Sequence, residues 1–498
     1  MTDAPPQNPS SGQPFSSQDV AQPARTADPR RWKALAVLLL VQFMLILDVS
    51  AVNIALPNIQ SDLEISRSGL TWVVDSYVLV AGSLLLLGGR LGDLLGRRRV
   101  FLIGAAVFGV SSLTCALAQG QSTLIASRAA QGLGEALAAP AALGLIALLF
   151  TDRKERTKAI GLFGGISGLA GTAGPIVSGA LVEYASWRWI FLVNIPVAVF
   201  AIVVLPRLVK ADKARPAGER TRLDLPGAAL STLGVAGIVF GLIEAATYDW
   251  GSARVLGPLL GGIVLIGAFV AFESRTAQPL LPLSFLRERT RVAANATTLV
   301  FASVFFTQFF ITTLFLQQVL GFGPLRAGLA YLPFGVAIGI GIGIATSLLP
   351  KLGLRPVLLT GLLTTAVGVL LYTRISADGS YVGDVLPGMV VVALGSGLTL
   401  PTLQNAAVYR VDESNAGLAA GLQQAVQQIG GAIGLALLIT IALRSADDSA
   451  ASAAVAQTEG YVLAFQLGLG LLLVATVLAA VLVPGSRSAT DEDVPASA

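Results

Sequence analysis

The sequence predicts an all-α protein that crosses a lipid bilayer fourteen times, and three observations support this prediction. Hydrophobic residues make up 54% of the 498 residues and charged residues only 12%, whereas soluble domains carry roughly 25% charged residues. Apolar runs of about 20 residues recur along the chain, which is the length that a membrane-spanning helix needs. Lysine and arginine are abundant in every second connection between these runs, as the positive-inside rule requires.

Each predicted helix is an apolar run bounded by polar or charged connections. In chain order, the runs are residues 34–57, 69–91, 99–118, 122–148, 158–182, 188–206, 225–247, 255–273, 293–317, 326–349, 355–374, 384–408, 415–443 and 460–483. The runs do not alternate with a period of two, so the sequence argues against a β-barrel. The residues left over are too few for a soluble catalytic domain.

The orientation follows from the positive charges. If the N-terminus lies in the cytoplasm, most of the 33 lysines and arginines fall on the inner side, and no outer connection contains a lysine. An even number of crossings then places both termini in the cytoplasm. The expected location is the inner, cytoplasmic membrane of the cell, as a multi-pass protein.

The connections predict a division into two groups of six helices with an insertion between them. Residues 1–30 and 486–498 are polar and are expected to be disordered cytoplasmic tails. Residues 31–206 and 292–485 each contain six runs and are expected to form two bundles. Residues 207–291 contain a charged inner connection and two inserted helices.

The connection after the second run carries the clearest local motif. It reads Gly89-Arg90-Leu91-Gly92-Asp93-Leu94-Leu95-Gly96-Arg97-Arg98-Arg99, and a weaker copy, Pro350-Lys351-Leu352-Gly353-Leu354-Arg355, follows the tenth run. Such an internal repeat is typical of transporters. Asp93 can pair with Arg97, and the glycines permit a tight turn. We therefore predict a gating loop rather than a simple topogenic charge, formed by Gly89, Asp93, Gly96, Arg97 and Arg98.

Four ionisable side chains lie deep inside the predicted helices of the first group, where each is costly and indicates function. At 1.5 Å per residue, Asp48, Asp75 and Arg128 lie about 9–13 Å below the outer end of their helices, and Glu135 about 19 Å below it. Arg128 stays charged and needs a carboxylate partner, for which Asp48 and Asp75 match its depth best. A carboxyl group without such a partner is favoured in its protonated form, as a proton carrier requires. The structural alternative is a static ion pair that fixes the packing of the helices.

The remaining composition restricts the chemistry. The chain has no histidine and one cysteine, Cys115. It therefore has no His-ligated metal site, and carboxyl groups are the side chains expected to bind and release protons. A phosphate-binding loop is absent, because the pair Gly-Lys never occurs. We therefore expect no cofactor and no nucleic-acid partner, with an ion gradient as the energy source. A monomer is the expected functional unit.

Glycine recurs every three to five residues in the fifth run, at Gly168, Gly171, Gly174 and Gly179. Small residues at this spacing let helices approach closely, and Pro175 is expected to kink the helix. The pattern predicts close packing in any case, and in addition a seam that seals or slides between conformations.

Amide side chains interrupt several apolar runs, and they either line a substrate path or bond neighbouring helices. The candidates for a substrate cavity are Asn53, Gln404, Asn405, Gln427 and Gln428. The ninth run is rich in phenylalanine, including Phe310 and Phe315. For these rings we favour contact with lipid over a pocket for flat apolar substrates.

These residues together resemble the major facilitator superfamily and, within it, the fourteen-helix drug:proton antiporters. The Gly89–Arg99 segment is similar to the superfamily's signature between helices 2 and 3, and Leu47–Pro57 to a first-helix motif of the fourteen-helix branch. Arg128–Gly134 resembles the helix 4 motif, whose arginine is linked to proton transfer, and Gly168–Gly179 resembles the helix 5 motif of antiporters. Glu135 departs from this pattern, in which a small residue is expected.

The resemblance implies a proton-coupled secondary active exporter of amphipathic drugs or antibiotics, and not an enzyme. Alternating access would be driven by protonation of Asp48 and Glu135, with Arg128 tuning them and Asp75 as a further candidate. An exporter of an endogenous lipid, sugar or secondary metabolite would carry the same motifs. A membrane enzyme would need a base or nucleophile cluster at the interface, and a signalling protein would lack buried carboxyl groups.

Overall fold

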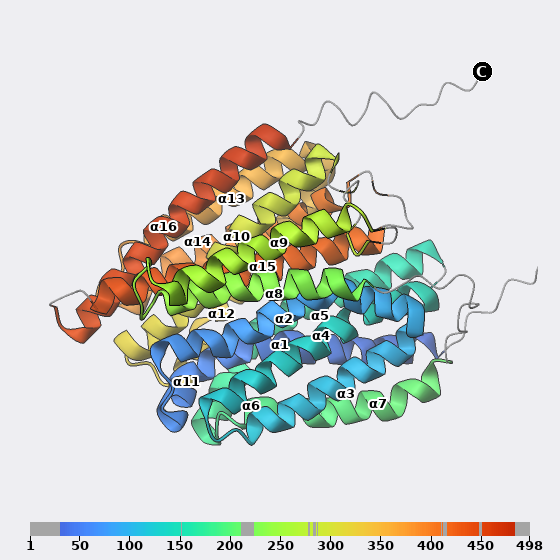
Figure 1. Ribbon diagram of the computed structural model, residues 1–498, viewed down its shortest axis with the longest axis horizontal. Helices are drawn as coiled ribbons and strands as arrows, with labels where there is room; N and C mark the ends of the chain where they lie inside the picture. The colour runs from blue at the N-terminus through green and yellow to red at the C-terminus, as the bar shows by residue number, and fades with distance from the viewer. Residues whose placement is uncertain are drawn as a thin grey trace, which may run out of the picture.

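The computed structural model describes residues 30–150, 152–210, 224–276, 279–281, 285, 287–409, 411, 416–447 and 451–483. These residues form α-helices and two short π-helical segments, and no strand occurs among them (Figure 1). The predicted tails at 1–30 and 486–498 lie outside the described residues, except for Arg30.

The helices begin and end as follows. The first group contains α1 (Arg31–Leu63), α2 (Arg67–Leu95), α3 (Arg97–Ala116), α4 (Gln121–Leu149), α5 (Arg153–Tyr184), α6 (Trp189–Leu192) and α7 (Asn194–Leu208). The inserted pair is α8 (Leu225–Glu244) and α9 (Ala253–Glu273). The second group contains α10 (Arg289–Leu314), η3 (Phe315–Val319), α11 (Pro324–Ala330), α12 (Leu332–Leu352), α13 (Leu354–Tyr372), η4 (Tyr381–Val385), α14 (Leu386–Ala407), α15 (Ala416–Asp447) and α16 (Ala453–Leu482).

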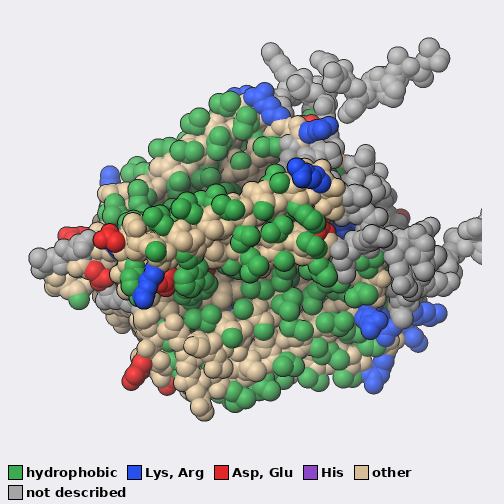
Figure 2. Space-filling view, in the orientation of Figure 1, with side chains coloured by type: hydrophobic (Ala, Val, Ile, Leu, Met, Phe, Trp, Pro, Cys, Tyr) green, Lys and Arg blue, Asp and Glu red, His purple; other side chains and the backbone are tan. Residues whose placement is uncertain are grey.

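Within the described residues, fourteen helical spans are long and apolar enough to cross a membrane. This confirms the predicted runs in number and order. Most spans are longer than the corresponding apolar runs, as in Arg31–Leu63 against the predicted 34–57, because helical hydrogen bonding continues past the apolar core into polar residues. Apolar side chains cover the visible face of the molecule, and charged side chains gather towards its two ends (Figure 2).

The two groups of six helices pack in the same way. In the first group α4 packs against α2 and α3, and α1 packs against α5; in the second, α14 packs against α12 and α13, and α10 packs against α15. The repeat extends to backbone detail. Gly96 and Gly353 occupy the matching turns with φ of 94° and 79°, a conformation that glycine adopts without strain. The structure therefore contains two related bundles, as the two sequence motifs predict.

The inserted helices lie beside both bundles. Helix α8 packs against α2 of the first bundle and α15 of the second, and α9 packs chiefly against α8 (Figure 1). The ring of Trp72 on α2 lies 5.9 Å from that of Phe240 on α8, and Thr440 on α15 donates to the carbonyl of Leu242 on α8 at 2.8 Å. Helix α8 is therefore anchored to the two bundles at once.

The molecule has two ends, which are named here by residues. The Gly96 end contains the turns at Gly96 and Gly353. The opposite end is called the Gln60 end, because α1 ends shortly after Gln60, and η3 also ends there, shortly before Gly321. Two seams join the bundles: α2 with α15, and α5 with α11 and α12.

Candidate functional site

A buried ion pair forms the centre of the first bundle. Arg128 on α4 donates from Nη1 to Oδ2 of Asp48 on α1 at 2.5 Å, and both residues are 1% exposed. The other carboxylate oxygen of Asp48 accepts hydrogen bonds from Gln131 Nε2 at 3.2 Å and from Asn194 Nδ2 at 2.7 Å. Asp48 is therefore held by donors from α4 and α7 and has both of its oxygens occupied.

The guanidinium group of Arg128 is also fixed on its other sides. Its Nε donates to the carbonyl of Val73 at 3.1 Å, and Nη1 donates to Gln131 Oε1 at 2.8 Å. The ring of Tyr77 lies 4.3 Å from the guanidinium carbon, at a distance where cation–π attraction is favourable. The sequence left Asp48 and Asp75 open as partners, and the structure shows that the partner is Asp48.

Sequence reasoning missed the amides that complete this network. Gln131 lies one helical turn from Arg128, so the i,i+3 spacing on α4 is a signal that points to it. Asn194 is the first residue of α7 and comes from a distant part of the chain. Ser112 on α3 accepts from Gln131 at 2.8 Å. The spacing of the sequence contains no signal for these last two contacts.

Glu135 carries a carboxyl group near this network but takes no part in the hydrogen bonds around Asp48 and Arg128. It lies seven residues after Arg128 on α4 and therefore on the same helix face. It is 4% exposed, and its Oε2 has no hydrogen-bond partner among the described residues. The hydroxyl group of Tyr77, whose ring stacks on Arg128, lies beside Glu135. Tyr77 thus connects the ion pair with an uncommitted carboxyl group.

Asp75 does not join this cluster. It is fully buried on α2, and neither of its carboxyl oxygens has a partner in the described part of the chain. Val73 and Tyr77 of α2 face α4. Asp75 lies two residues from each of them, so it projects from the opposite side of the helix and points away from α4. The four ionisable side chains therefore form one cluster of three and one isolated carboxyl group.

The predicted gating loop is mostly helical. Helix α2 continues to Leu95, so Gly89 and Asp93 belong to it, and the turn consists of Gly96 alone. Arg97 donates from Nε and Nη2 to Asp93 Oδ1 at 3.3 and 3.0 Å, and from Nη1 to the carbonyl of Gly144 on α4 at 2.8 Å. The structure thus contains the expected Asp93–Arg97 pair, and the same arginine bonds the turn to α4. Arg98 lies one residue further along α3.

The glycine stripe of α5 is packed along only half of its length. A Cβ atom at Gly179 would lie 2.5 Å from the carbonyl oxygen of Pro324 on α11, and one at Gly174 would collide with Ser50 on α1. Gly168 and Gly171, towards the Gly96 end, face no atom within 4 Å of such a Cβ. Pro175, the predicted kink, has its carbonyl against Gly328 of α11. The glycine stripe therefore meets the second bundle at Gly179, towards the Gln60 end, and not at Gly168 or Gly171.

The candidate amides do not gather in one cavity. Asn53 donates to the carbonyl of Val49 in its own helix at 3.0 Å. Gln428 packs against Gly82 in the seam between α2 and α15, and Gln427 beside it is half-buried. Gln404 and Asn405 are exposed on α14. Of the two interpretations left open by the sequence, Gln428 fits packing between helices.

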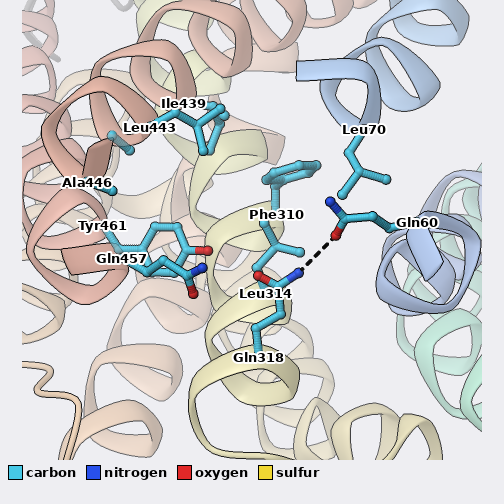
Figure 3. A pocket seen from close by; sticks show the side chains of 11 residues that line it. Gln60, Leu70, Phe310, Leu314, Gln318, Ile439, Leu443, Ala446, Gln457 and Tyr461 are labelled. Atoms are coloured by element: carbon cyan, nitrogen blue, oxygen red, sulfur yellow. Dashed lines mark hydrogen bonds between the residues drawn. The ribbon is translucent and has the colours of Figure 1, made fainter. Parts of the chain in front are cut away.

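A pocket lies instead at the Gln60 end, between the two bundles (Figure 3). The pocket is partly open to solvent. Gln60 and Leu70 come from the first bundle, and the second bundle supplies Phe310, Leu314, Gln318, Ile439, Ala442, Leu443, Ala446, Gln457 and Tyr461. Apart from Phe310, the sequence did not single these residues out, because most of them lie near helix ends, where polar side chains are common.

The aromatic segment of α10 corrects one expectation. Phe310 and Phe315 are buried, and Phe310 lines the pocket. The prediction of lipid contact is therefore wrong for these two rings. Phe305, Phe306 and Phe309 are partly buried and pack against the core. The rings turn inward because α10 is central in its bundle and packs against α14, α15 and α16.

Known proteins resemble this chain over most of its length. The sequence model of the Major Facilitator Superfamily matches residues 38–435. A puromycin resistance protein of Streptomyces alboniger is 39% identical and covers 93% of this chain and 94% of its own length. A lincomycin resistance protein of Streptomyces lincolnensis is 37% identical and covers 79% of this chain and 81% of its own length.

A solved structure agrees with these matches at the level of the fold. The crystal structure of a D-xylose–proton symporter is 14% identical, covers 91% of this chain and 98% of its own, and superposes with a TM-score of 0.64. At this level of identity the likeness concerns the arrangement of the helices.

Proposed function

The chain belongs to the Major Facilitator Superfamily, and we propose that it is a proton-coupled exporter of antibiotics or related amphipathic compounds in the cytoplasmic membrane. It is a multi-pass membrane transporter and not an enzyme. The observation that carries the proton part of the proposal is the uncommitted carboxyl group of Glu135 beside the Asp48–Arg128 pair. The substrate class rests on the relatives that confer puromycin and lincomycin resistance.

The conformation fits the loading step of alternating access. At the Gln60 end, Gln317 donates to the carbonyl of Ile54 at 2.9 Å, and Gln318 donates to Gln60 at 3.4 Å, so the bundles are joined there. At the Gly96 end, α5 has no neighbour along its glycine stripe. With the orientation that the positive charges predict, the Gly96 end faces the cytoplasm. The substrate would enter from the cytoplasm or the inner leaflet.

The proton cycle uses the residues of the first bundle. When the bundles rock, Glu135 takes a proton from outside, and the loss of its negative charge weakens the hold on a cationic or hydrogen-bonding substrate. On return, Glu135 releases the proton to the cytoplasm as the next substrate binds. Asp48 keeps Arg128 in place throughout, and Arg128 favours proton release through its positive charge. We propose that the cycle needs no cofactor and runs in a monomer.

The proposal is tested in everted membrane vesicles that carry the protein and hold a proton gradient set by respiration. Addition of puromycin, lincomycin or ethidium is expected to discharge part of the gradient, because each exported molecule exchanges for protons. Vesicles without the protein, to which the same compounds are added, are the control. If the inserted protein responds to none of the compounds, drug export is the wrong substrate class, and a lipid, sugar or endogenous metabolite must be tried.

The two halves of the α5 stripe are expected to respond oppositely to substitution. In Gly179→Ala, the new Cβ would press on the backbone of Pro324 and Leu325, and such overpacking costs about 1–3 kcal/mol. The variant should open the Gln60 end, with roughly a tenfold or greater shift of the conformational equilibrium. Gly164 lies one helical turn before Gly168 on α5. In Gly164→Ala, no atom lies near the new Cβ in this conformation, so the shift should be small or favour the present state.

The measurement is the labelling rate of a cysteine placed at Gln457, which lines the pocket at the Gln60 end. The native Cys115 is buried, so background labelling by a membrane-impermeant maleimide is low. Gly179→Ala should raise the rate and Gly164→Ala should not. Equal rates in the two variants would contradict the assignment of the α5 contact as the closed gate.

A further inference from the structure

We propose that Asp75 is a second proton-binding site, opened and closed by the seam that α2, α15 and the inserted helix α8 form. The proposal rests on the proposed proton-coupled export and extends it. It gives the inserted pair a role, because α8 is one of the walls that exclude water from Asp75.

Asp75 is buried without any compensating contact. It is 0% exposed, and both carboxyl oxygens lack a hydrogen-bond partner among the described residues. A buried carboxylate without a cation or donors is strongly unfavourable. Asp75 is therefore expected to hold its proton in this conformation. Packing alone does not require a carboxyl group at such a position.

The rotation of α2 places Asp75 in the seam. Gly82, seven residues further along α2, lies directly against Gln428, Ala425 and Ile429 of α15. Residues seven apart share a helix face, so Asp75 also faces α15. Because the two helices run antiparallel, the residues of α15 at its level lie about seven positions beyond Gln428, where Leu435 and its neighbours are buried and apolar.

Helix α8 closes the seam from the side. Trp72, one turn before Asp75 on α2, contacts Phe240 of α8. Thr440 of α15 is bonded to the backbone of α8 at Leu242. The side chains of α2 and α15 around Asp75 are thus bridged by one inserted helix. Separation of α2 from α15 would require these two contacts to change.

No charged group faces Asp75 from the described helices packed around it. Helix α8 carries only Glu244, at its last residue, and α15 carries only Arg444 and Asp447, both in its last turn. On α4, Arg128 is bound to Asp48. Glu135 is also on α4, and Asp75 points away from that helix. On α3, the only charged residues, Arg97, Arg98 and Arg99, lie at the Gly96 end. On α1, Asp48 is bound to Arg128, Asp62 is bound to Arg188, and Arg31 and Lys33 lie in the first turn. The proton on Asp75 is thus controlled by access to water rather than by a neighbouring charge.

The pocket at the Gln60 end provides the access. It lies between the ends of α2 and α15, where Leu70 of one helix and Ile439 of the other line it (Figure 3). Leu70 is five residues from Asp75, or about 7.5 Å along the helix axis. Opening of the bundles at this end would extend the pocket along the seam to Asp75. The carboxyl group would then exchange its proton with the outer solution and keep it when the seam closes.

The test counts the protons exchanged for each substrate molecule. Purified protein in liposomes is exposed to opposed gradients of substrate and protons, and the pH difference that stops net flux gives the ratio. Asp75→Asn keeps the shape and a neutral charge, so it should fold and should exchange one proton fewer than the wild type. Asp75→Glu should keep the wild-type ratio. Ser76→Ala, a change at the adjacent buried residue, is the matched control and should also keep it.

The outcomes separate the two proposals. If wild-type flux does not respond to pH at all, proton-coupled export itself is wrong. If the wild type is coupled and Asp75→Asn exchanges the same number of protons, Asp75 is not a proton site and the proposed function stands. If Ser76→Ala loses a proton as well, the effect belongs to packing of the seam, and the inference is also overturned.

Discussion

Asp48→Asn is expected to lower the stability of the protein by about 3–5 kcal/mol and to abolish export. The substitution leaves the guanidinium group of Arg128, which is 1% exposed, without its counter-charge. An uncompensated buried charge is more costly than the loss of the attraction alone suggests. The remaining bonds of Arg128 to Val73 and Gln131 involve neutral groups and do not replace the carboxylate.

The stability effect is measured by thermal unfolding of the purified protein in detergent. The matched variant is the double substitution Asp48→Asn with Arg128→Met, which removes both charges and keeps a long side chain against Tyr77. The double variant should recover much of the lost stability and still fail to export. If Asp48→Asn unfolds at the wild-type temperature, the pair does not hold the bundle together, and Asp48 is free to act as a carrier itself.

Glu135→Gln is expected to leave the protein folded and to remove export driven by the proton gradient. Glutamine has the shape of the protonated acid, and the carboxyl group has an oxygen without a hydrogen-bond partner in the described residues. Glutamine also keeps an oxygen that can accept a hydrogen bond from the neighbouring Tyr77 hydroxyl group, so stability should be unchanged or higher. Exchange of labelled for unlabelled substrate across the membrane should continue, because that exchange needs no net proton movement.

These two properties are measured in liposomes, with gradient-driven uptake and substrate exchange recorded on the same preparation. Glu244→Gln is the control, because Glu244 is a half-buried carboxyl group at the Gln60 end of α8, away from the cluster. It should behave as the wild type in both assays. Loss of exchange together with uptake in Glu135→Gln would instead mean that the substrate cannot bind at all without the charge of Glu135, or that Glu135 is needed for folding.

The helices and their repeat were predictable because they follow from local properties of the chain. The length of the apolar runs and the placement of the charges predict the fourteen spans, and the two glycine motifs predict the related turns at Gly96 and Gly353. The depth of a residue also follows from its position in the run. For this reason, the sequence alone places Arg128 and its carboxylate partner at the same level.

Rotation of the helices about their axes was not predictable in the same way. Asp48 and Asp75 have similar depths, and only the packing of α1 and α2 around α4 turns Asp48 towards Arg128 and Asp75 away from it. The same holds for Phe310, which turns into the pocket rather than towards lipid. Contacts between bundles, such as that of Gln317 with Ile54, join residues 263 positions apart and have no local signature.

The proposed mechanism requires that substrate and proton compete through Glu135, and proton release on substrate binding tests this competition most directly. Purified protein in weakly buffered detergent solution is mixed with a compound that it exports, and the pH of the solution is recorded. The wild type should acidify the solution when the substrate binds, and Glu135→Gln should bind the substrate with a smaller release of protons. Equal release from the two proteins at equal occupancy would contradict competition through Glu135.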